Sequence, residues 1–121
     1  MQFPIGNGVQ LAPTTGVIPN DTYTMVVDFR FDAVSGFRRI ADFKNGSSDS
    51  GFYVLNGALN FFNVTTGSGT PVAANSYVRA ALTRDGSKNV VGYVNGVQQF
   101  TFVDSGDLRS EERRVGKECR L

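Results

Sequence analysis

Two Asn-Gly pairs, each set within a run of apolar and aromatic residues, constrain the fold of this chain most. Asn56-Gly57 lies in the middle of residues 51–62, and Asn95-Gly96 lies in the middle of residues 90–102. A two-residue connection between antiparallel strands needs positive φ at both central positions, which Asn and Gly adopt at low cost. Each pair therefore predicts a β-hairpin that is closed by a type I′ turn.

Further segments have the character of strands, and helix signals are nearly absent before residue 109. They are residues 23–31, 38–43 and 77–84. In the first of them, Phe29 is expected on one face and Asp28 on the other, because alternate side chains of a strand point to opposite sides. Short strands that are separated by turns, with no crossover helices, predict an all-β fold: an antiparallel β-sandwich of the jelly-roll kind.

The composition of the chain changes at residue 109. Residues 1–108 contain eight Asp, seven Lys or Arg and no Glu, whereas the last thirteen residues contain all three Glu, five basic residues and the single Cys. We therefore expect a β-sandwich body over 1–108 and a non-native tail over 109–121, unstructured or a short frayed helix. A natural C-terminal helix, capped by Ser110, is the alternative.

Two motifs near the end of the body are the most specific ones: the strand and turn over residues 76–86, and the Tyr-x-Asn-Gly hairpin over 91–97. With residues 23–31, 40–43 and 51–54, they give residues 9–108 a resemblance to laminin-G-like jelly-roll domains of the concanavalin-A-like lectin/glucanase superfamily. The most similar versions occur in exported bacterial proteins that end in a PEP-CTERM sorting tail. Tyr77 stands where the family commonly has Trp.

The resemblance implies further strands after the second hairpin. In their place, residues 109–119 resemble the translation of a widely used sequencing-adapter oligonucleotide. The chain is thus expected to be a truncated domain, incomplete at its C-terminus and, if Met1 is an internal start, at its N-terminus too. Residues 1–6 show no signal peptide. The intact parent is expected to be extracellular or located at the cell surface.

Catalytic chemistry is not expected, because residues 1–108 lack Glu, His and Cys. The paired carboxylates of superfamily glucanases are typically Glu, and nucleophilic triads and zinc sites need His or Cys. Asp28 and Asp32 share a strand face with Arg30, which is typical of a solvated, charge-balanced surface. We therefore predict no catalytic residues and no enzyme, and a fragment of a glycoside hydrolase is the disfavoured alternative.

The loop over residues 45–50 supplies the candidate ligand-binding residues, Asn45 and Asp49. Its oxygen atoms suit a hard cation, and laminin-G-like domains often hold calcium at a rim, so Asp49 is the calcium candidate. One carboxylate is few for calcium, so a polar hairpin loop is the favoured interpretation and no cofactor is expected.

Of the neighbours Phe61 and Phe62, one must lie outside the core, covered by a missing strand or a loop.

The functional expectation comes from the resemblance. It implies a non-catalytic recognition or adhesion module that binds a glycan or an extracellular protein through rim loops. A structural spacer without a ligand is the alternative.

The net charge of +1 gives no indication of nucleic-acid binding. No apolar run approaches the length of about 18–20 residues that membrane insertion requires.

Overall fold

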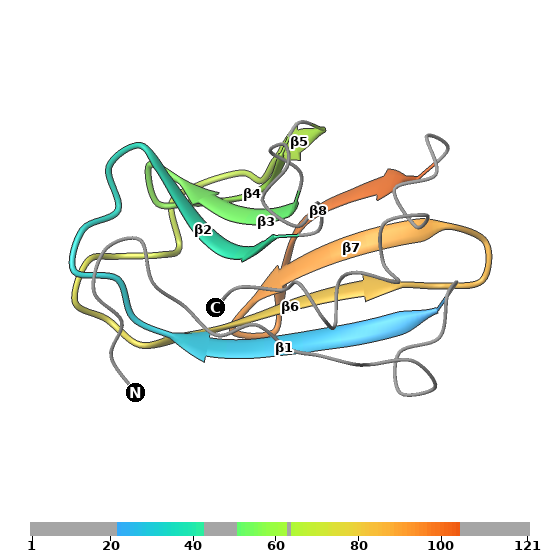
Figure 1. Cartoon of the computed structure of the whole chain (residues 1–121), viewed down its shortest axis with the longest axis horizontal. Coiled ribbons are helices and arrows are strands. Elements are labelled where there is room, and N and C mark those ends of the chain that lie inside the picture. Colours follow the sequence, from blue (N-terminus) through green and yellow to red (C-terminus); the bar gives the residue numbers. More distant parts are fainter. Residues whose placement is uncertain (1–21, 43–50, 63, 105–121) are drawn as a thin grey trace.

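The computed structural model describes residues 22–42, 51–62 and 64–104, which form eight strands in two four-stranded sheets. The first sheet has the order β1-β6-β7-β8, and the second has the order β2-β3-β4-β5 (Figure 1). Every pair of neighbouring strands is antiparallel. The prediction of an all-β sandwich is confirmed, and the described residues contain no helix.

The strands of the first sheet are β1 (Tyr23–Phe29), β6 (Val78–Arg84), β7 (Asn89–Val94) and β8 (Val97–Val103). Those of the second are β2 (Phe37–Asp42), β3 (Gly51–Leu55), β4 (Ala58–Phe62) and β5 (Thr65–Thr66). Each predicted strand is present, with ends that differ by at most two residues. Both predicted hairpins are confirmed, with φ of 49° and 87° at Asn56 and Gly57 and of 50° and 83° at Asn95 and Gly96.

The core fills the space between the two sheets. The following side chains contribute to it from β6, β7, β3 and β4: Ala80, Leu82, Val90, Val94, Phe52, Val54, Leu59 and Phe61. In β1 the pattern alternates as predicted, with Phe29 half-buried and Asp28 exposed. The strand ends at Phe29, and Phe31 follows it with its ring 4.9 Å from that of Phe29.

The adjacent rings of Phe61 and Phe62 lie on opposite faces of β4, as predicted. Phe61 is buried in the core, and Phe62 is half-buried on the outer face. The described ring contacts of Phe62 are with Phe37 of β2 and Tyr53 of β3, at centroid distances of 5.3 and 5.7 Å. Among the described residues the outer ring is therefore packed against its neighbours within the sheet, and the expectation of cover from a loop or a missing strand stays a prediction.

The first sheet contains a buried ion pair that joins β6 to the residue after β8. Arg84 Nε donates a hydrogen bond to Asp104 Oδ2 at 3.1 Å, and both side chains are almost fully buried. A backbone hydrogen bond from Asp104 N to Lys88 O, at 2.8 Å, holds the same point. The end of β8 is thus fixed by charge as well as by its ladder with β7.

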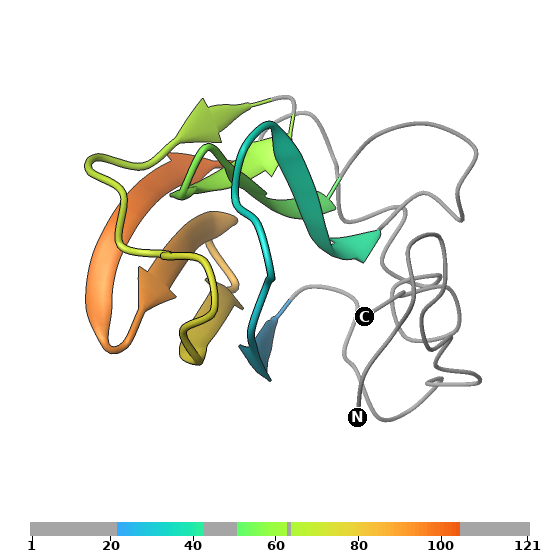
Figure 2. The same cartoon turned by 90° about the vertical axis from the view of Figure 1, so that its left-hand side faces the viewer.

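One edge of the sandwich is closed by contact between β5 and β8, which lie side by side in Figures 1 and 2. Gly67 follows β5 and donates a backbone hydrogen bond to Leu59 O at 2.7 Å. A Cβ atom at position 67 would lie 2.9 Å from both Cβ and O of Gln99 in β8. Glycine permits this close approach of the two chain segments.

Candidate functional site

A shallow depression of about 670 Å³ lies where β1 and β6 meet the turn between β7 and β8. It is lined by Asp28, Tyr77, Val78, Arg79, Asn95 and Gly96. Tyr77 precedes β6 directly and is 78% exposed, more than any other large hydrophobic or aromatic residue among those described. An aromatic ring that is held at the end of a sheet yet open to water is the feature that a ligand can use.

Asp28 and Arg79 form a two-point ion pair across β1 and β6. Arg79 Nε donates to Asp28 Oδ1 at 2.7 Å, and Arg79 Nη2 donates to Oδ2 at 2.9 Å. The two residues are directly opposite in the antiparallel register, so their side chains share the outer face. The hydrogen bond from Arg79 lowers the pKa of Asp28, and the same hydrogen bond raises the pKa of Arg79.

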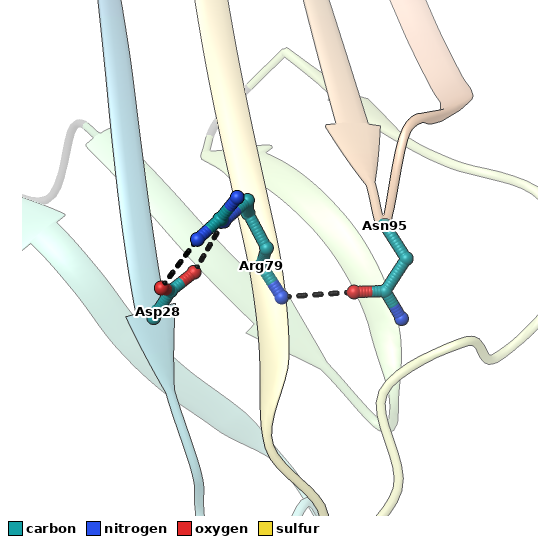
Figure 3. A network of polar contacts seen from close by, with 3 residues as sticks. All are labelled: Asp28, Arg79 and Asn95. Carbon is teal, nitrogen blue, oxygen red and sulfur yellow. Dashed lines mark hydrogen bonds and ion pairs between the residues drawn. The ribbon is translucent and has the colours of Figure 1, made fainter.

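Asn95 is held against the backbone of the same arginine. Arg79 N donates to Asn95 Oδ1 at 2.9 Å, and Asn95 N donates to Arg79 O at 2.8 Å. Figure 3 shows the resulting row of Asp28 on β1, Arg79 on β6 and Asn95 at the hairpin turn. Asn95 Nδ2 has no partner among the described residues, so the row presents a carboxylate, guanidinium nitrogens and an amide donor beside Tyr77.

The same clamp occurs at the other Asn-Gly hairpin. Gly36 N donates to Asn56 Oδ1 at 2.7 Å, and Asn56 N donates to Gly36 O at 3.0 Å. Gly36 comes directly before β2, the neighbour of β3, just as Arg79 lies on the neighbour of β7. In both hairpins the turn asparagine therefore binds the backbone of a third strand segment, in addition to closing its own two-residue turn.

Charges around the depression are balanced. Arg30 Cζ lies 5.7 Å from the centroid of the Tyr77 ring, within the range of a cation–π contact. Arg30 Nη2 also lies 3.5 Å from Asp32 Oδ1. Asp28, Arg30 and Asp32 are all exposed, as predicted, but β1 ends at Phe29, so Arg30 and Asp32 do not share a strand face with Asp28. Asp28 pairs with Arg79 of β6 rather than with its neighbour Arg30.

The residues that the sequence analysis put forward as ligand-binding, Asn45 and Asp49, lie outside the described residues. The calcium hypothesis at Asp49 therefore stays a prediction. The part of the chain that the structure describes brings together no group of three His, Cys, Asp or Glu side chains that could hold a metal ion. The depression at Tyr77 was not predicted as a site, although Tyr77 had been noted at a position where the family commonly has Trp.

Within the described ranges, no helix has the length and apolar character needed to cross a membrane. Comparison of the chain with models of protein families, with curated proteins and with solved structures gave no match in any of the three. Assignment of a function thus depends on the residues of this chain and on the site they form.

Proposed function

We propose that this domain is a non-catalytic recognition module that binds a neutral glycan in the depression at Tyr77. The observation that carries the proposal is the 78% exposure of Tyr77 next to the hydrogen-bonded row of Asp28, Arg79 and Asn95. A sugar ring has an apolar face that suits an aromatic ring, and hydroxyl groups that suit fixed donors and acceptors. The proposal also takes up the resemblance to laminin-G-like jelly rolls and places the parent protein outside a bacterial cell.

A neutral ligand is favoured over a charged one because the charged groups here are already paired. Asp28 and Arg79 share two hydrogen bonds, and Arg30 contacts both Asp32 and the Tyr77 ring. A charged ligand would have to break one of these pairs to find a partner of opposite charge. Hydroxyl groups can instead use the remaining acceptor positions of Asp28, and the Nδ2 donor of Asn95.

The lining also supports binding without catalysis. Hydrolysis of a glycosidic bond generally uses two carboxyl groups on either side of the scissile bond. Among the described residues, the depression is lined by one carboxylate, Asp28, whose pKa is lowered by the hydrogen bond from Arg79. A general acid needs the opposite change, a raised pKa.

The test is a screen of neutral and acidic oligosaccharides with the wild-type chain and with Tyr77→Ala. We expect binding to neutral oligosaccharides, weakened at least about tenfold by Tyr77→Ala, since removal of a central aromatic anchor costs more than about 1.4 kcal/mol. Phe37→Ala is the matched control, because Phe37 is an exposed ring (51%) on β2 of the other sheet. Absence of binding to any glycan would favour a structural spacer, and equal losses in the two variants would overturn the assignment of the ligand to the depression at Tyr77.

A further inference from the structure

Asn95 belongs to a dipeptide with a reactivity of its own. When glycine follows asparagine, no Cβ atom obstructs attack by the glycine backbone nitrogen on the asparagine side chain. The chain has four Asn-Gly pairs, and the structure describes two of them, Asn56-Gly57 and Asn95-Gly96. Since their turn conformations are nearly identical, the two pairs form a matched comparison within one molecule.

The reaction needs water and no other reagent. The backbone nitrogen of Gly96 forms a bond to Asn95 Cγ, the Cγ–Nδ2 bond breaks, and ammonia leaves with the proton that the glycine amide loses. The product is a five-membered succinimide ring. Water then opens the ring at one of its two carbonyl carbons, and the chain contains either aspartate or isoaspartate, in which the backbone runs through the former side chain.

Both asparagines carry the feature that favours the first step. The attack places negative charge on Oδ1, and a backbone N–H that already points at this oxygen stabilises it. Arg79 N lies 2.9 Å from Asn95 Oδ1, and Gly36 N lies 2.7 Å from Asn56 Oδ1. Activation of the side chain therefore does not distinguish the two hairpins.

The glycines do differ. Gly57 is buried, its carbonyl oxygen accepts a hydrogen bond from Val72 N at 3.0 Å, and its Cα faces Val72 O and Thr70 so closely that a Cβ would lie 2.9 and 3.2 Å from them. Gly96 is exposed, and a Cβ there would meet no atom of the described residues within 4 Å. The Asn-Gly peptide unit must rotate to bring the glycine nitrogen to Cγ, and this rotation displaces the glycine Cα and the carbonyl that follows it. At Gly57 both are held by Val72, whereas at Gly96 neither contacts another segment among the described residues.

We propose that Asn95 is a site of spontaneous deamidation, and that Asn56 is protected by the packing of Gly57 against Val72. The aspartate product keeps an oxygen acceptor for Arg79 N and adds a negative charge to the depression. The isoaspartate product adds one backbone atom to the turn, so the two hydrogen bonds between residue 95 and Arg79 can no longer form together. Modification thus changes the charge, and the backbone, of the surface that contains Tyr77.

The test is incubation of the full chain at mildly alkaline pH, followed by peptide mapping with separation of aspartate and isoaspartate. Because one hydrogen bond is worth about fivefold in rate, we expect Asn95 to react at least about fivefold faster than Asn56 in the folded protein. In denaturant the two sites should react at similar rates, because both are Asn-Gly. Equal rates in the folded protein, or a faster reaction at Asn56, would overturn the proposal.

A second readout follows the structural consequence by hydrogen exchange of the Arg79 amide. We expect faster exchange in the aged protein, and unchanged exchange in Asn95→Asp, which keeps the acceptor oxygen. Gly96→Asn is the unreactive control: asparagine tolerates positive φ, and its side chain hinders the attack. Loss of protection at Arg79 in aged Gly96→Asn to the same extent as in the wild type would refute the assignment to residue 95. Neither readout requires a ligand, so the outcome is separate from that of the glycan test.

Discussion

The hairpins β3–β4 and β7–β8 have the same turn and the same asparagine clamp, but opposite surroundings. In β3 and β4 eight of ten residues are buried, and Gly57 of the turn is buried with them. In β7 buried and accessible residues alternate, most of β8 is accessible, and Gly96 is exposed. Local chemistry therefore selects the connection, whereas the packing around it sets what a substitution costs and which side chains a ligand can reach.

The largest effect on stability is expected at the buried ion pair that holds the end of β8, whereas the β3–β4 hairpin is held mainly by apolar contacts. Asp104→Ala leaves Arg84 buried without its carboxylate and should lower the free energy of unfolding by about 3–5 kcal/mol. Urea unfolding measures the loss. The double variant Arg84→Met with Asp104→Leu removes both charges and should recover most of it. A loss below about 1 kcal/mol in Asp104→Ala would show that β8 is anchored by its apolar contacts, as β4 is.

A second prediction compares the two turn glycines directly. Alanine at either position incurs the strain of positive φ, about 1–2 kcal/mol. Gly57→Ala adds a clash with Val72 O and Thr70, and overpacking of this kind typically costs about 1–3 kcal/mol more. We expect the two variants to differ in their free energy of unfolding by about that amount. Gly96→Ala has open space and should cost the strain alone. Equal losses in urea unfolding would mean that the enclosure of Gly57 relaxes at no cost.

The smallest effect concerns the stability at acid pH, and it tests the sheet that contains the β7–β8 hairpin. Because the pKa of Asp28 is lower in the folded state, its pairing stabilises the protein fully above the unfolded value, near 3.8. This contribution is lost as the pH falls through the lower folded pKa. Asp28→Asn should therefore flatten the fall in melting temperature below about pH 4. Arg79→Lys, which keeps the charge but not the two-point geometry, should lie between that variant and the wild type.

The hairpins could be predicted from sequence because their determinants are adjacent residues. Asn and Gly at two consecutive positions fix the sign of φ, and alternation within five or six residues gives the inner face. The division of Phe61 and Phe62 between two faces followed from the same alternation. The contact of Phe62 with Phe37 did not, because it depends on the pairing of β2 with β3 and of β3 with β4.

The candidate site could not be predicted from the sequence, because its residues come from distant parts of the chain. Asp28 and Arg79 are 51 residues apart, and they meet because β1 lies next to β6 rather than next to β2. Asn95 reaches Arg79 across 16 residues through a clamp that a two-residue turn does not require. Arg84 and Asp104 likewise pair across β7. Alternation places a charged side chain on a face, but only the order of strands gives it a partner.

Gly67 has a consequence for the association of this protein with other copies of itself. A strand at the margin of a sheet offers backbone groups on which other molecules can assemble, and β8 carries the exposed side chains Val97 and Val103. The absence of a side chain at position 67 lets the segment after β5 lie directly against Gln99, where the register of β7 and β8 also shifts. A side chain at position 67 is therefore expected to separate the two segments, leave the edge of β8 open to other copies and lower the solubility of the domain.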